Sequence, residues 1–322
     1  MQRYRILASS MFLILVGFST GHSAEPVKGT GDWTLYYIAE ASSDVVKSGG
    51  NVAVITRDGE KLRYQVAPAE LRKATVEGTA AGVDPKTGAW IVSNIVATGV
   101  WEDLPEGWEG KGNRANPLAT YRSVAADQKH HPFGSRIYAE TLKGWTPPGF
   151  EEPHDGFLWV SDVGGAIKGW MRFDLFVGKQ STYDFVRAED KGEGQWHVPI
   201  EIEHMPHVPK GYELRTYAGV HKILHGVGII ENEEMVIDEV EDSIAKFQKL
   251  HKHIPKSEYD DTRGAITQWY LTQAALKVSK GEVYDPVAAG LREAADPEED
   301  EGEEKQPEED EGEEKQPEED EK

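Results

Sequence analysis

Before about residue 205, apolar and polar residues mostly alternate along the chain, a pattern typical of half-buried β-strands. The alternation predicts strands at residues 33–38, 51–56, 62–66, 90–96, 183–187 and 196–202. Asp58-Gly59, between the second and third of these strands, is typical of a hairpin turn. One short helix is expected at residues 69–75, and Gly78 marks its end.

From about residue 212, apolar residues recur every three to four positions, which is typical of amphipathic helices. The pattern predicts three helices whose apolar faces are Val220, Ile223, Leu224 and Val227; Met235, Ile237, Val240, Ile244, Phe247 and Leu250; and Ile266, Tyr270 and Ala274. Asp261-Thr262 is expected to cap the third helix. These helices are expected to form a small bundle with Phe247 in its core.

Charge and composition change the picture mainly at the two ends of the chain. Residues 1–24 combine two arginines, an apolar run and a small-residue end, which predicts a secretory signal with no membrane span after its cleavage. The formal net charge is −22, and residues 296–322 carry −14 of it in an acidic repeat. Such a tail has no apolar residues for a core, so residues 286–322 are predicted to be disordered. The remaining chain has no basic stripe, so we expect no nucleic acid partner.

The candidate chemistry lies between residues 155 and 178, where two apolar runs flank Gly164-Gly165. If these runs pair as a hairpin centred near Lys168, Asp162 and Asp174 lie opposite each other, with Cβ atoms roughly 4.5–5.5 Å apart. Two such carboxylates cannot both ionise readily, so the pKa of one rises. A carboxylic acid that is still protonated near neutral pH is what glycosidic bond cleavage requires. The alternative, two solvated turn residues, stays open on spacing alone.

A resemblance to a known family favours the catalytic interpretation. Asp162-Val-Gly-Gly-Ala-Ile-Lys-Gly169 and Asp174-Leu-Phe-Val-Gly178 resemble the signature of the three-aspartate (3D) domain family. Upstream, 121–127 and 131–138 resemble the preceding family block, in which an aspartate ends a strand before a Pro-x-Gly turn. The family includes the membrane-bound lytic transglycosylase A group. Val163 departs from the family, which usually has Thr at that position.

The resemblance implies an α+β fold, with a six-stranded double-psi β-barrel at residues 25–205 and a three-helix bundle at 206–285. It implies that Asp174 is the catalytic acid, Asp162 its partner, and Asp127 the third member of the set. We assign Lys168 and Arg172 to orienting these acids or the saccharide. The other expected substrate-binding residues are Gly164, Gly165, Trp170 and Tyr121.

The implied activity is non-hydrolytic cleavage of peptidoglycan glycan strands between N-acetylmuramic acid and N-acetylglucosamine, leaving a 1,6-anhydro end. The bundle is similar, around Phe247-Gln248, to the Phe-Gln type of peptidoglycan-binding domain. With the secretory signal, this predicts an exported protein of the periplasm or cell wall. The rival hypothesis is a non-catalytic, expansin-like module that binds polysaccharide without turnover. The oligomeric state is not predicted.

Four tryptophans and a pair of histidines are further candidates for a ligand site. Trp101, Trp108, Trp145 and Trp170 can each stack on a sugar ring or fold back onto the core. His221 and His225 have the helical spacing of zinc ligands, but the glutamate of a His-Glu-x-x-His motif is missing, and the chain has no cysteine. We therefore expect no metal and no cofactor.

Overall fold

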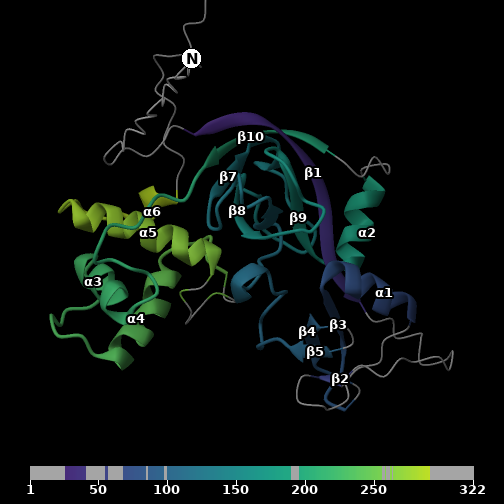
Figure 1. The fold of residues 1–322 in the computed structure, drawn as a ribbon, viewed down its shortest axis with the longest axis horizontal. Coiled ribbons are helices and arrows are strands. Elements are labelled where there is room, and N and C mark those ends of the chain that lie inside the picture. Colours follow the sequence, from purple (N-terminus) through teal and green to yellow (C-terminus); the bar gives the residue numbers. More distant parts are fainter. Residues whose placement is uncertain are drawn as a thin grey trace, which may run out of the picture. The chain divides into compact units, whose positions relative to one another are not determined.

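The computed structural model describes residues 26–40, 55–56, 68–84, 86–97, 100–189, 196–255, 258, 262 and 264–290 (Figure 1). The strands are β1 (Val27–Glu40), β2 (Ile55–Thr56), β3 (Thr79–Val83), β4 (Trp90–Ala97), β5 (Val100–Asp103), β6 (Ser123–Ala126), β7 (Arg136–Ala139), β8 (Phe157–Asp162), β9 (Arg172–Lys179) and β10 (Trp196–Glu203). The helices are α1 (Pro68–Glu77), α2 (Gln180–Glu189), α3 (Tyr217–Gly226), α4 (Ile237–Lys249), α5 (Ala265–Ser279) and α6 (Pro286–Ala289).

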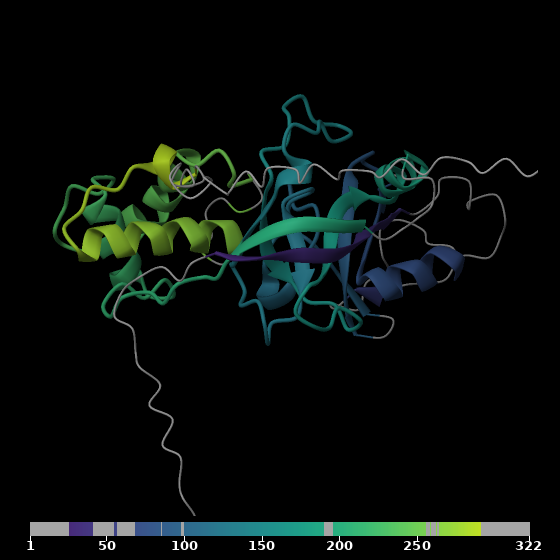
Figure 2. The same cartoon turned by 90° about the horizontal axis from the view of Figure 1, so that it is seen from above.

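Six strands close into a barrel in the order β1, β10, β7, β8, β6 and β9, and β9 returns to β1 (Figure 1). The pairs β6–β8 and β1–β9 are parallel, and the other four are antiparallel. Figure 2 shows β10 lying alongside β1, in the register that joins Trp33 to Trp196 and Val27 to Ile202. Closure leaves no exposed barrel edge. The α+β class and the six-stranded barrel predicted from the sequence are confirmed.

Strand β1 also carries the chain from the barrel into a second group of strands. Beyond the barrel, Ala39 and Glu40 pair in parallel with β3, and the sheet continues through β4 and β5 to β2. Trp101 of β5 is fully buried in a small core with Ala39 and Ala74. Trp101 is therefore a core residue and not a platform for sugar.

Helices α1 and α2 give one confirmed and one wrong prediction. Helix α1 contains the predicted residues 69–75 and is followed by Gly78 in the left-handed conformation, with φ of 79°. The strand predicted at 183–187 is wrong, because these residues belong to α2. Tyr183 and Val186, one helical turn apart, are partly buried apolar residues of α2, and the Tyr183 ring packs on Tyr37 with centroids 4.4 Å apart.

Helices α3, α4 and α5 form the predicted bundle around one core. Phe247 is 1 % exposed, as expected, and the residues of the other two apolar faces are largely buried. Met235, Ile237 and Leu250, at the ends of the second predicted face, are 46, 47 and 53 % exposed. They therefore lie outside the core, and α4 buries a shorter face than the sequence pattern indicated.

The bundle shares its core with the barrel wall. Trp159 and Phe157 of β8 lie in the same buried cluster as Trp269 and Tyr270 of α5. The rings of Trp159 and Tyr270 have centroids 6.4 Å apart. A polar junction lies beside these rings, because Asp155 is bonded to both Arg122 and His253. Burial of the shared aromatic surface thus joins bundle and barrel.

Several predictions lie outside the described residues: the signal at 1–24, most of the 51–66 hairpin and residues 291–322 of the tail. The tail was predicted to be disordered from residue 286, and its start is wrong, because Pro286–Ala289 form α6, capped by the Asp285 side chain. Within the described segments, none of the helices has both the length and the apolar character needed to cross a bilayer.

Candidate active site

Asp162 and Asp174 lie on two strands that are separated by a third. Strand β6 runs between β8 and β9, and Ala125 of β6 is in register with Asp162 on one side and with Asp174 on the other. Residues in register across a sheet project to the same face. The predicted hairpin with directly opposed acids is therefore wrong. The two acids share a face across one alanine, with backbones roughly 10 Å apart for two strand spacings.

The Asp174 carboxyl is buried, and burial is the main cause of its changed acidity. Burial raises the pKa of Asp174 to about 6, against the opposing effects of the Thr34 hydroxyl and the Arg172 guanidinium. Arg172 donates a 3.0 Å hydrogen bond to Thr34 Oγ1, and Thr34 in turn bonds Asp174. Removal from water destabilises the charged form of a carboxyl group. The pKa of Asp174 is therefore raised by burial and not, as the sequence suggested, by the charge of Asp162.

Asp162 is the more firmly held of the two acids. Its Oδ1 accepts hydrogen bonds from the backbone N–H groups of Asn113, at 2.9 Å, and Val163, at 2.8 Å. These bonds favour the carboxylate, but burial dominates and raises the pKa of Asp162 to about 6, and the negative charge of Asp174 adds to the increase. A Cβ at Gly112 would come within 3.3 Å of the Asp162 Cβ and 2.7 Å of Ser161 O, so only glycine fits there.

Two further polar residues join the acids from β1 and α1, and sequence analysis missed both. Tyr36 faces Asp162 and Asp174, and burial together with these two charges raises the pKa of its phenol. Burial also raises the pKa of Glu77 to about 7, to which the charge of Asp174 contributes. Glu77 Oε2 accepts a 3.4 Å hydrogen bond from the Tyr37 N–H. Neither residue belongs to the motif, and no local pattern links them to it.

Among the buried polar atoms that strand β9 brings to this site, Asp174 Oδ1 and Arg172 Nη1 have no hydrogen-bond partner among the described residues. Buried polar atoms in folded proteins nearly always have partners. Here the two unpartnered atoms lie on residues two apart in β9, which point to the same face. An acceptor and a donor are thus available together for a polar ligand.

Asp127 is placed differently from the other two aspartates. It follows β6, and its carboxylate accepts hydrogen bonds from the N–H groups of Lys129 and Gly169, each at 3.1 Å. These bonds lower the pKa of Asp127, and the nearby Lys168 ammonium lowers it further. Asp127 therefore ties the 163–171 loop to the end of β6. Lys168 lies beside Asp127, whereas Arg172 lies beside Asp174.

The remaining predicted substrate-binding residues are spread over several environments. Trp170 is 39 % exposed, and its ring packs on His131 and His204, with centroids 4.9 and 6.0 Å away. Gly165 has open space around it, whereas a side chain at Gly164 would strike Ile167. Tyr121 is 1 % exposed, so its ring belongs to the core. No group of three or more His, Asp or Glu side chains within the described ranges could hold a metal ion.

Comparison with models of known families supports the resemblance to the 3D domain. Residues 122–191 match the model of the 3D domain, which extends from the start of β6 through β8 and β9. This segment is a 3D domain. The three aspartates of the resemblance therefore lie within the matched residues, and Tyr36 and Glu77 come to the site from outside it.

Solved structures with some likeness to about half of this chain were also found. A membrane-bound lytic murein transglycosylase from Agrobacterium tumefaciens is 17 % identical, with 55 % of this chain and 76 % of that one covered and a TM-score of 0.38. E. coli MltA with bound chitohexaose is 14 % identical, covering 55 % and 73 %, with a TM-score of 0.36. LtgG of Burkholderia pseudomallei is 16 % identical, covering 55 % and 75 %, with a TM-score of 0.35. No curated protein matches the sequence.

Proposed function

We propose that the protein is a lytic transglycosylase that cleaves the bond between N-acetylmuramic acid and N-acetylglucosamine in peptidoglycan. The observation that carries the proposal is the pair of buried acids on one face of the 3D domain, each with its pKa raised to about 6. At pH 7 such a group carries its proton in roughly a tenth of molecules, about a hundredfold more than a carboxyl group with a pKa of about 4. Solvated turn aspartates would titrate near 4.

Asp174 is the proton donor in this proposal. In its protonated form it transfers a proton to the glycosidic oxygen as the bond to the anomeric carbon breaks. The resulting carboxylate then takes the proton of the substrate's own 6-hydroxyl group, whose oxygen attacks the anomeric carbon. The 1,6-anhydro ring forms, Asp174 recovers its proton, and no water is consumed. Asp174 Oδ1, which lacks a partner, is the atom available for the transfer.

The other polar residues position the acid and the sugar. Arg172 reaches Asp174 through Thr34, and its unpartnered Nη1 can donate to a sugar oxygen. Asp162 supplies negative charge on the same face, which would stabilise positive charge developing at the anomeric carbon. Asp127, with Lys168, holds the loop that carries Trp170. Trp170 is the exposed aromatic ring of this set and is available to pack on a pyranose.

The rival function, polysaccharide binding without turnover, predicts the same fold and a different set of products. The test is mass spectrometry of peptidoglycan digested with the purified protein. We expect anhydro-muropeptides with the native protein, and a rate about 10²–10⁴-fold lower for Asp174→Asn. Asp238→Asn, which removes an exposed acid from α4, is the matched control and should be fully active.

Three results of the digest would contradict the proposal. Binding without any product would favour the expansin-like module. Products with ordinary reducing ends would indicate a hydrolase. Unchanged activity of Asp174→Asn would remove the proposed donor. Action on peptidoglycan also requires export, and the predicted signal at residues 1–24 supports a location in the periplasm or cell wall.

A further inference from the structure

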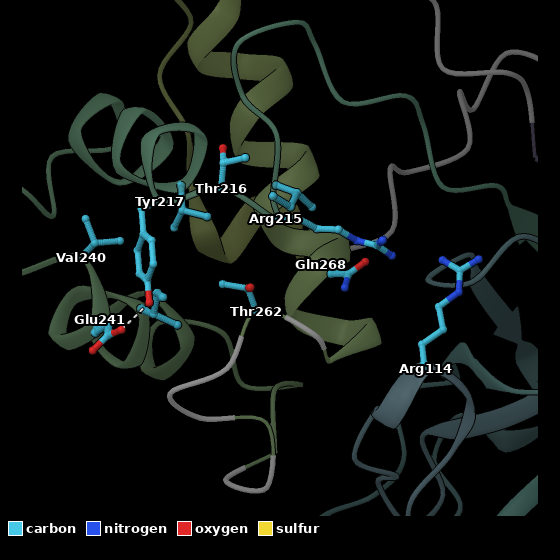
Figure 3. A pocket seen from close by; sticks show the side chains of 11 residues that line it. Arg114, Arg215, Thr216, Tyr217, Val240, Glu241, Thr262 and Gln268 are labelled. Carbon is cyan, nitrogen blue, oxygen red and sulfur yellow. Dashed lines mark hydrogen bonds between the residues drawn. The ribbon is translucent and has the colours of Figure 1, made fainter. Parts of the chain in front are cut away.

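A cavity of about 890 Å³ lies beside the helical bundle, away from the acid pair (Figure 3). Its apolar lining comes from Leu214, Val220, Val240 and Ile244, on α3, α4 and the segment before α3. Its polar lining includes Arg114, Arg215, Thr216, Thr262 and Gln268. Polar and charged residues therefore outnumber apolar ones in the lining, which favours a polar ligand, and the volume lies in the usual range of ligand sites, roughly 300–1,000 Å³.

The charge of the cavity is set by two arginines that come from different parts of the fold. Arg215 precedes α3, and Arg114 lies in the barrel loop before β6; Figure 3 shows Arg215 extending toward the side on which Arg114 lies. Both side chains are exposed, and none of the described carboxylates forms an ion pair with either. A guanidinium group binds carboxylate through paired hydrogen bonds. Two of them predict a ligand with carboxylate groups.

A carboxylate of the protein lines the same cavity. Glu241 of α4 accepts a hydrogen bond from the Tyr217 hydroxyl, drawn as the dashed line in Figure 3. Glu241 has no basic partner among the described residues, so it is available to pair with a cation. A ligand that carries carboxylates toward the arginines and an amine toward Glu241 would match all three charges. Peptides with acidic and amino groups have this chemistry, whereas an uncharged saccharide does not.

A short turn connects this cavity to the acid pair. Residues Asn113–Ala115 form a 3₁₀ turn in which Arg114 has a left-handed backbone, with φ of 59°. The N–H of Asn113 donates to the Asp162 carboxylate, and the next side chain, Arg114, lines the cavity. Left-handed non-glycine residues are uncommon and concentrate at functional sites. One turn thus borders both sites.

We propose that this cavity binds an acidic peptide with a free amine, the peptide that branches from the glycan being cut. The source of the peptide rests on the proposed function, whereas binding itself does not. A glycan strand with its peptide in the cavity would be held in register with the acids, because the Asn113–Ala115 turn borders both. The bundle would then select peptide-bearing over naked glycan.

The test uses calorimetric titration of the whole protein with the synthetic tripeptide alanyl-γ-glutamyl-lysine, which carries both charge types. We expect saturable binding, and a loss of affinity of about tenfold or more for Arg215→Gln and for Arg114→Gln, since each removes charge-assisted hydrogen bonds. Glu241→Gln should weaken binding of the intact tripeptide. It should leave unchanged the binding of a tripeptide acetylated at both Nα and Nε, which has no amine to pair with Glu241. Lys246→Gln, which removes an exposed cation of α4 that does not line the cavity, should bind as the native protein does.

A second arm distinguishes the peptide from other sources of carboxylate. Peptide-bearing peptidoglycan and glycan stripped of its peptides by an amidase are compared in sedimentation assays, and we expect Arg215→Gln to weaken binding of the first only. The inference would be overturned if the native protein did not bind the tripeptide, or if the arginine variants bound it as tightly as the native protein does. It would also be overturned if Arg215→Gln weakened binding of stripped glycan as much as binding of peptide-bearing peptidoglycan. Because no assay here requires cleavage, failure of the proposed activity leaves these results interpretable.

Discussion

At the scale of single residues, the account depends on how burial changes one carboxyl group. Burial raises the pKa of Asp174 to about 6, although Thr34 and Arg172 act in the opposite direction. A group arranged purely for folding would have its charge stabilised in the native state. Asp174 is instead left with one unpartnered buried oxygen. We interpret this as stability exchanged for reactivity, which is common at catalytic sites.

This interpretation predicts that Asp174→Asn stabilises the folded protein at pH 7.5. The folded-state pKa lies above the unfolded value of about 4, so the folded state binds more protons between pH 4 and 6 and loses stability as pH rises through that range. Removing the acid should therefore raise the free energy of unfolding by about 2 kcal/mol at pH 7.5 and by little at pH 4. Urea unfolding of both proteins at the two pH values measures it. An equal effect at both would contradict the pH linkage.

The motif alone predicted Asp162 and Asp174 but could not predict the residues that complete their environment. Tyr36 and Glu77 are more than 80 residues from Asp162 in sequence, and they reach the acids because β1 pairs with β9 and α1 lies against β1. Neither has a distinctive local pattern. Tyr121 shows the reverse error, since its place in the matched block suggested the ligand, whereas its ring is buried.

At the scale of elements, predictions failed where distant segments override local pattern. The hairpin of β8 and β9 was inferred from two apolar runs joined by glycines, but β6 lies between them and pairs with both. Local spacing carries no information about an inserted strand. The predicted cap of α5 at Asp261-Thr262 is also wrong, because the helix begins at Ala265. Its first N–H groups instead donate hydrogen bonds to Asn116, which is far away in sequence, and to the nearby Glu258.

Asn116 provides a test at this scale. Its side chain is fully buried, accepts a 2.7 Å hydrogen bond from the Ala265 N–H and donates a 3.1 Å bond to Ser161 O, next to Asp162. Asn116→Ala leaves two buried backbone groups without partners, and we expect about 2–4 kcal/mol lower free energy of unfolding. Asn232→Ala, which removes only an exposed acceptor of the Glu234 N–H hydrogen bond, should change it by about 1 kcal/mol or less. Equal effects of the two variants in urea unfolding would show that Asn116 does not join α5 to β8.

At the scale of the whole molecule, the described chain joins the barrel that carries the acid pair to a sheet extension and to a helical bundle. Alternation predicted β1 and β10, apolar runs predicted β8 and β9, and helical periodicity predicted the three bundle helices, because each of these buries a regular face. The shared core of Trp159 with α5 was not predictable, since both partners read as ordinary core residues. The hydrogen bond between Asp155 and His253 was not predictable either, because the two residues lie 98 positions apart in sequence.

The pH dependence of product formation tests the central claim, a buried acid that donates its proton near neutral pH. As pH rises and Asp174 loses its proton, the rate of anhydro-muropeptide formation under saturating substrate should fall, with a midpoint near the raised pKa of about 6. A midpoint near 4, the value of a solvated aspartate, would contradict the account.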